Sequence, residues 1–598
     1  MSHPSLSTCL CLYLAASVVH GQMVTGSGML DYAETLGLSE GKPAFTASYL
    51  GSSAPSSILW PGEAAVVTAQ VINVSSAPLR VGGRIDLIRY GTRGIPNNIW
   101  RPQMVRIAQV ASIPVAIDLE PAGWTNLVFS PAIPETKGAY ALVVDFDSAG
   151  RVFLASLVRT FAQGNRQPQY PVFCMDIANA ETLTRLGVAP NRIGISYHPT
   201  TSGDFEDWYR GATSRLREYQ KAGLPVTVEI GGGDWFCEEQ PLGRPRPWLD
   251  DQGQMKDTQF DLAWLPGCDP DFKRFAKRLV SDFGWPRGPV NGIKLWNEPW
   301  EGMSIAGWGS DMLRYREIFR ALAEATREAC AEQGLEVLVG GCDSASNTFD
   351  KLFSDGSDDW LEYLDFCSIH YQGMFPPSSF KAWRNRKHPN GRVRVWDTES
   401  WVANCDDRVA AVVAGNLSTG HDRAVGVFGG NVIWGENYWE ETQYFDDVGN
   451  KRKKNVVSAW SVAAAVGAVS EFIGPRPFER LAYTNGLPWV MVFNGRLDET
   501  GRPKPDDGTV VVVGDLGEEF EADNLWPRTA RGLHEKDAKQ ALFEKLSVLG
   551  ADAPERNGLL EQFTTGETLK HATMTLAVPK PASAQDADCF ALYDFYGN

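Results

Sequence analysis

Two short polar runs hold the glutamates best placed for chemistry in this sequence. Glu298 lies in Trp296-Asn297-Glu298-Pro299-Trp300, and Glu399 lies in Trp396-Asp397-Thr398-Glu399-Ser400-Trp401. Each run continues a short apolar segment typical of a buried strand. Two carboxyl groups that face each other can cleave a glycosidic bond, because one protonates the departing oxygen while the other attacks the anomeric carbon or activates water. Retaining enzymes hold the pair about 5–5.5 Å apart and inverting enzymes about 6.5–9.5 Å apart.

The elements that must position these glutamates form a regular alternation of strands and helices. The predicted strands are Pro171–Asp176, Arg192–Tyr197, Pro225–Ile230, Gly292–Trp296, Glu336–Gly341, Phe366–Tyr371, Val393–Asp397 and Ala424–Trp434. Helices are predicted at Asp204–Gly223, with Gly223 closing the helix, and at Asp311–Gly334. Eight such units predict an α/β fold, a (β/α)8 TIM barrel over residues 170–474, in which catalytic groups sit at the C-terminal strand ends.

An open doubly wound sheet is the alternative arrangement of the same elements. It would carry a glycine-rich phosphate loop after its first strand, and the sequence PVFCMDIANAET has none. The barrel is therefore preferred, and it brings the ends of the fourth and seventh strands to one open face.

Shorter strands with Pro and Gly spacers flank the barrel. We expect a signal peptide at 1–21, a linker at 22–42, an N-terminal β-sandwich at 43–165 and a C-terminal β-domain at 475–598. In the last of these, Phe590–Phe595 is predicted as a strand, and only Tyr596-Gly597-Asn598 follows it. This ending suggests either a truncated chain or a sheet edge completed by another segment.

Composition excludes several classes of partner. The formal net charge of −17 disfavours nucleic acid and anionic membranes, and no later segment has the about 18 apolar residues of a membrane span. The apolar run LCLYLAASVV near the N-terminus predicts export, so we expect a secreted or periplasmic protein. The scattered cysteines show no Cys-x-x-Cys and no neighbouring His cluster, so no metal is expected, and no cofactor motif is present.

The constellation resembles clan A of the glycoside hydrolases, which are retaining (β/α)8 enzymes. In that clan an Asn-Glu pair ends strand four, matched here by Asn297-Glu298, and the Glu is the acid/base. The nucleophile ends strand seven, matched by Glu399. His370 and Tyr371 resemble the strand-six region of the clan, although here the two residues are adjacent.

Two further positions extend the resemblance, which covers roughly residues 170–474. Arg192 resembles the arginine that supports the nucleophile, although it opens the predicted second strand instead of ending it. Trp434 matches the strand-eight tryptophan that floors the sugar site. Among subfamilies, the β-xylosidase/α-iduronidase and cellulase-like groups look nearest, and no motif decides between them. The resemblance implies a β-glycoside as substrate.

Each predicted role has a physical reason. An arginine and a hydroxyl donor would favour the ionised form of Glu399, whereas burial beside that charge would keep Glu298 protonated. Asn297 would hydrogen-bond the sugar 2-hydroxyl. Further expected sugar contacts are Glu436 and the tryptophans Trp300, Trp401 and Trp434, whose flat apolar faces suit sugar C–H faces.

Plainer interpretations stand beside these roles. Arg192 could bridge a carboxylate in the barrel wall, His370 could be a core histidine, and Glu436 could be a solvated loop acid. Asp397 is expected to pack rather than react. For the whole chain, the main alternative to a hydrolase is a carbohydrate-binding protein that kept the barrel and lost activity. A serine-type hydrolase is disfavoured, because no Gly-x-Ser-x-Gly elbow is present.

Overall fold

The computed structural model describes residues 32–95, 98–164, 167–176, 179–232, 246–249, 255–259, 264, 266–298, 312–341, 362–370, 392–399, 405–406, 409–418, 420–428, 440–483, 489–496, 502, 504, 508–514 and 594–598. The predicted signal peptide, the first ten residues of the predicted linker and several predicted mouth residues lie outside these ranges. The predicted site residues outside the described ranges are Trp300, Tyr371, Trp401, Trp434 and Glu436.

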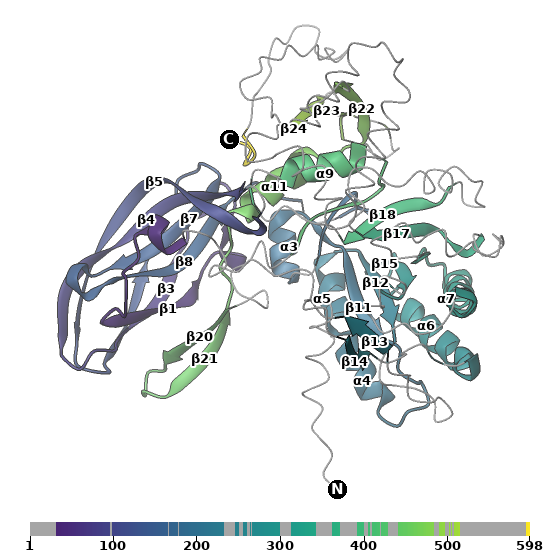
Figure 1. Ribbon diagram of the computed structural model, residues 1–598, viewed down its shortest axis with the longest axis horizontal. Coiled ribbons are helices and arrows are strands. Elements are labelled where there is room, and N and C mark those ends of the chain that lie inside the picture. The colour runs from purple at the N-terminus through teal and green to yellow at the C-terminus, as the bar shows by residue number, and fades with distance from the viewer. Residues whose placement is uncertain are drawn as a thin grey trace.

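A curled sheet of six parallel strands forms the centre of the α/β part (Figure 1). In spatial order these are β11 (Arg192–Ser196), β12 (Val226–Gly231), β15 (Val290–Leu295), β16 (Leu338–Gly341), β17 (Phe366–His370) and β18 (Arg394–Glu399). A second parallel sheet contains β10 (Ala189–Pro190), β9 (Phe173–Asp176) and β19 (Ala424–Phe428). Each of the eight predicted segments overlaps one of these strands, and the two-residue strand β10 was not predicted.

Hydrogen bonds connect the two parallel sheets at both sides. On one side, Asn191 donates its backbone N–H to Met175 of β9 at 2.9 Å and accepts from Thr227 of β12 at 3.3 Å. On the other side, Trp396 of β18 forms a parallel bridge with Arg423, directly before β19. Parallel strands are buried on both faces, which agrees with the near-continuous burial of β12 and β15.

Helices cover the outer face of the parallel strands (Figure 1). They are α3 (Ala180–Leu186), α4 (Phe205–Ala212), α5 (Ser214–Ala222), α6 (Asp269–Phe283), α7 (Met312–Gln333), α9 (Val409–Ser418) and α11 (Val462–Phe472). The helix expected at Asp204–Gly223 is two helices, which meet at Thr213, and Gly223 ends the second with φ +69° as predicted. None of the helices in the described ranges is long and apolar enough to cross a membrane.

Two sheets make up the N-terminal β-part and share one hydrophobic core. One holds β1 (Phe45–Ser52), β3 (Val67–Asn73) and β6 (Trp124–Phe129); the other holds β2 (Ile58–Leu59), β8 (Arg151–Arg159), β7 (Gly138–Asp145), β4 (Leu79–Ile95) and β5 (Asn98–Leu119). Before them, within the range expected to be a linker, Tyr32–Leu36 form the short helix α2, and Leu36 is fully buried. An apolar side chain at this position can thus fix local structure that the weak sequence pattern did not indicate.

A hairpin between β19 and α11 packs on the N-terminal β-part (Figure 1). It consists of β20 (Glu440–Phe445) and β21 (Lys451–Val456). The buried side-chain amide of Gln70 exchanges two hydrogen bonds with the backbone of Phe445, one at 2.9 Å and one at 2.7 Å. The Phe445 ring also stacks on Trp124, with centroids 6.2 Å apart.

The described C-terminal strands are β22 (Phe478–Tyr483), β23 (Trp489–Phe493) and β24 (Val510–Gly514), which form an antiparallel sheet against α9. Asp594 and Phe595 belong to no strand, so the prediction of a strand is wrong for this end of Phe590–Phe595. They enter a turn, in which Gly597 donates its backbone N–H to the Asp594 carbonyl at 2.9 Å.

A buried aspartate joins three distant parts of the chain. The carboxylate of Asp406 accepts hydrogen bonds from the Thr92 backbone N–H at 2.7 Å, the Thr92 hydroxyl at 2.8 Å and the Ser461 hydroxyl at 2.8 Å. The phenol of Tyr596 donates to the same carboxylate. Burial raises the pKa of Asp406 to about 6, despite these four donors.

Candidate active site

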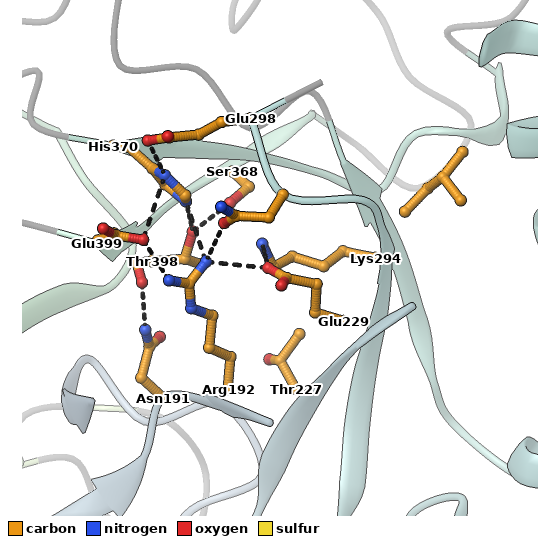
Figure 2. A network of polar contacts seen from close by, with 12 residues as sticks. Asn191, Arg192, Thr227, Glu229, Lys294, Glu298, Ser368, His370, Thr398 and Glu399 are labelled. Atoms are coloured by element: carbon orange, nitrogen blue, oxygen red, sulfur yellow. Dashed lines mark hydrogen bonds and ion pairs between the residues drawn. The ribbon is translucent and has the colours of Figure 1, made fainter. Parts of the chain in front are cut away.

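The C-terminal ends of the parallel strands bring most of the described candidate residues together (Figure 2). Asn297 and Glu298 follow β15 after Trp296, His370 ends β17, and Glu399 ends β18. The backbone leaves β15 through unusual conformations, because Trp296 has φ +60° and Glu298 has φ +42°. Residues other than glycine rarely adopt positive φ, and such strain gathers at functional sites. Glu298 is 3% exposed.

Arg192 is the centre of the polar network in Figure 2. Its Nη2 donates to Oε2 of Glu399, while its Nη1 lies 2.9 Å from Oε2 of Glu229 and 2.7 Å from Oδ1 of Asn297. One guanidinium group therefore links the ends of β12, β15 and β18. Arg192 opens β11, as the sequence indicated, yet its long side chain reaches the residues at the other end of the strands. A start-of-strand position is therefore no obstacle to contact with Glu399.

His370 lies between the two candidate carboxyl groups and is fully buried. Its Nδ1 is 2.7 Å from Oε1 of Glu298 and 3.6 Å from Oε2 of Glu399. Its Nε2 faces the Thr398 hydroxyl at 3.0 Å and Nη1 of Arg192 at 3.4 Å. Burial, with the positive charges of Arg192 and Lys294, holds the pKa of His370 well below its usual range, so the imidazole is neutral.

The tautomer of His370 follows from its neighbours. Arg192 is only a donor, so Nε2 of the neutral ring is the acceptor and Nδ1 carries the hydrogen. Ser368 contacts the Thr398 hydroxyl, which leaves that hydroxyl able to donate to Nε2. His370 then donates from Nδ1 to Glu298, which fixes one oxygen of that carboxyl group.

Glu298 and Glu399 approach each other closely. One oxygen from each, with a ring nitrogen of His370, all lie within 4.8 Å of one another. Carboxylates and imidazole are also metal ligands, and in the described part of the chain these three form the one group with such spacing. However, the Arg192 guanidinium binds Glu399 directly, and its charge opposes a cation at this position.

Sequence reasoning missed a second set of charged residues beneath this pair. Lys294 is fully buried, and its ammonium group contacts Oε2 of Glu229. Asp176, at the end of β9, is 3% exposed, and its Oδ1 lies 3.8 Å from Nε of Arg192. The signal was present, because a charge inside an apolar strand such as VNGIKL or VTVEIG requires a partner.

Neighbouring polar groups hold the end of β18, the strand that carries Glu399. Asp397 is 2% exposed and accepts from the Glu399 backbone N–H at 3.2 Å and from the Asn416 side chain at 3.2 Å. Asn191 donates to the Thr398 carbonyl at 2.5 Å. The contacts of Asp397 are thus those of a residue that holds the irregular end of β18, which is the plainer interpretation of the sequence.

Comparisons with known proteins add no family assignment. No family model matches the chain, and no curated protein matches it in sequence. Among solved structures, a glycoside hydrolase family 30 subfamily 8 xylanase from Clostridium acetobutylicum is 13% identical over 55% of this chain and 79% of its own, with a TM-score of 0.34.

Two other solved structures are similarly distant. The match to Bacteroides uniformis β-glucuronidase 2 is 10% identical over 79% of this chain and 57% of that one, with a TM-score of 0.28. The match to an Eisenbergiella tayi GH2 β-galacturonidase is 11% identical over 64% of each chain, with a TM-score of 0.25. These scores are too low to carry an argument, so the function must be argued from the site itself.

Proposed function

We propose that this protein is a retaining glycoside hydrolase, with Glu298 as acid/base and Glu399 as nucleophile. The observation that carries the proposal is the approach of the two carboxyl groups, whose nearest atoms lie within 4.8 Å. This limit joins single oxygen atoms, and it favours the about 5–5.5 Å separation between the carboxyl groups of retaining enzymes over the about 6.5–9.5 Å of inverting ones. An inverting enzyme needs that wider gap for its water molecule.

The contacts of each glutamate suit the proposed role. Arg192 donates to Oε2 of Glu399 and so orients this carboxyl group for attack through Oε1. Glu298 is buried, accepts from His370 at Oε1, and would carry its acidic proton on Oε2. Asn297 has its Oδ1 fixed by Arg192 at 2.7 Å, so its amide N–H group is the part that would donate to a sugar 2-hydroxyl.

The reaction would then proceed in two displacements. An oxygen of Glu399 bonds to the anomeric carbon while the glycosidic oxygen leaves with the proton of Glu298. Esterification removes the charge of Glu399, so Glu298 can next accept a proton from water. That water attacks the anomeric carbon, the ester bond breaks, and both glutamates return to their starting states. The substrate class implied by the resemblance is a β-linked oligo- or polysaccharide.

We also propose that the eight parallel strands close into one (β/α)8 barrel, with a β-sandwich before it and a further β-domain after it. The backbone bonds of Asn191 and the bridge between Trp396 and Arg423 support closure, because they connect both sides of the six-stranded sheet to the other parallel sheet. The shared core of the two N-terminal sheets supports the sandwich.

The test is a panel of chromogenic aryl β-glycosides with the wild type, Glu399→Gln and Glu298→Gln. We expect hydrolysis with retained anomeric configuration by NMR, and a loss of at least about 1,000-fold in Glu399→Gln, because the nucleophile is gone. Glu332→Gln is the matched control, since this glutamate lies on the outer helix α7 and is 57% exposed.

Two results would contradict the proposal. One is full activity in Glu399→Gln, and the other is a product of inverted configuration. Sugar binding without hydrolysis by the wild type would instead indicate a carbohydrate-binding protein.

A further inference from the structure

Lys294 is a lysine enclosed in the middle of the parallel sheet. It lies near the end of β15, is 0% exposed, and its Nζ contacts Oε2 of Glu229 on β12. Lysine is almost never fully buried unless it is paired, because removing its charge from water costs several kcal/mol. A charge held at this cost beside a candidate active site calls for a reason.

A continuous chain of ionic contacts joins Lys294 to the candidate nucleophile (Figure 2). The same Oε2 of Glu229 that contacts Lys294 accepts from Nη1 of Arg192 at 2.9 Å. The other terminal nitrogen of Arg192 donates to Glu399. Arg192 thus pairs with both Glu229 and Glu399, and Lys294 is a second cation that pairs with Glu229.

The charges balance only when Lys294 is counted. Arg192 and Lys294 offer two positive charges to Glu229 and Glu399, while two other groups that face Glu399 add no charge: His370 is neutral, and Glu298 is the protonated acid of the proposed function. The fifth charged neighbour is Asp176 on β9. Burial, followed by the charges of Glu399 and Glu229, raises its pKa to about 7 against the opposing effect of Arg192, so Asp176 is largely protonated in mild acid.

Lys294 keeps its charge over the same range. Burial lowers its pKa to about 8, so the ammonium form persists at neutral and acidic pH. Burial also raises the pKa of Glu229, but Lys294 and Arg192 outweigh it, and the net pKa of Glu229 is lowered. Glu229 therefore stays ionised while it holds Arg192.

We propose that Lys294 is a positioning residue that neutralises Glu229 and so leaves the charge of Arg192 to Glu399, which keeps the nucleophile ionised. This inference rests on the proposed function. Without Lys294, Glu229 and Glu399 compete for a single guanidinium group, and the share of its charge that stabilises the Glu399 carboxylate falls. The consequence is a nucleophile that needs a higher pH to become active.

The experiment measures kcat/KM against pH for Lys294→Met, Glu229→Gln and the double variant, with a substrate found in the aryl glycoside panel. Lys294→Met should move the acidic limb of the profile to higher pH by about one unit, the usual effect of one nearby charge. The double variant removes both charges and restores the balance between Arg192 and Glu399, so its acidic limb should return to the wild-type position. Lys273→Met is the matched control, because Lys273 lies on the outer helix α6.

Each outcome decides the inference. An unmoved acidic limb in folded Lys294→Met overturns it, as does a double variant whose limb stays displaced. If Lys294→Met fails to fold, the double variant decides alone: a wild-type limb supports the inference, and a displaced limb overturns it. A wild type that cleaves no glycoside contradicts the proposed function itself. An active wild type with an unmoved acidic limb in Lys294→Met contradicts only this inference.

Discussion

The buried carboxyl group of Asp406 should make stability depend on pH in a direction opposite to that of most acidic residues. Its pKa rises from an ordinary 3.8 to about 6 on folding, chiefly through burial. An acid whose pKa is raised in the folded state stabilises that state below its unfolded pKa, and the benefit is lost as pH rises through the folded pKa. The shift of about 2.2 units corresponds to about 3 kcal/mol, which should disappear between pH 4 and about 6.

The perturbation that isolates this effect is Asp406→Asn. The amide cannot accept from all four donors around Asp406, so the variant should be less stable than the wild type by an amount that does not depend on pH. On top of this offset, the wild type should lose about 2.4 kcal/mol relative to the variant as pH rises from 4 to 7.

The assay is urea unfolding of both proteins, followed by fluorescence at half-unit steps from pH 4 to 7. Asp207→Asn is the matched control, because Asp207 lies on α4 with 85% of its side chain exposed, and its difference from the wild type should stay nearly constant. A wild-type minus Asp406→Asn difference that is flat over this range, or that grows with pH, would refute the reasoning.

Two further predictions concern the active site. Glu298→Ala should lower kcat by about 100- to 10,000-fold on substrates whose leaving groups need a proton, and far less on dinitrophenyl glycosides, which leave unprotonated; an equal loss on both would contradict an acid/base role. Arg192→Lys should lower kcat/KM by about 100-fold or more, because an ammonium group cannot span Glu229, Asn297 and Glu399 as the guanidinium does. Near-wild-type kinetics in Arg192→Lys would mean that a charge alone suffices there.

The strands were predictable because their sequences are simple. Short apolar runs that alternate with helical patterns predicted segments overlapping eight of the nine parallel strands of the α/β part in the described ranges, and only the two-residue β10 was missed. The break at Thr213 was not predictable, because the helical pattern continues through it and the interruption lies in the backbone alone. The short helix Tyr32–Leu36 depends on the burial of Leu36 against distant strands, which no local pattern shows.

The candidate site was predictable where strand ends specify it. Asn297, Glu298, His370 and Glu399 end strands or follow them directly, so the fold alone implied their meeting. Glu229 and Lys294 were missed, because residues inside a strand are usually read as packing. Their pairing depends on the register between β12 and β15, where Glu229 lies directly beside Lys294. A sequence gives the strands, whereas register emerges only from their assembly.

The hairpin of β20 and β21 makes the α/β part depend on the N-terminal β-part. This hairpin lies between β19 and α11 in the chain and contacts the N-terminal β-part. There the Gln70 side-chain amide forms both backbone hydrogen bonds of Phe445. An excised α/β part would lose those partners and the Trp124 face at once. Genetic shuffling could not exchange the N-terminal part as a detachable module without also replacing this hairpin. The α/β part and the N-terminal β-part should therefore be expressed and engineered as one unit.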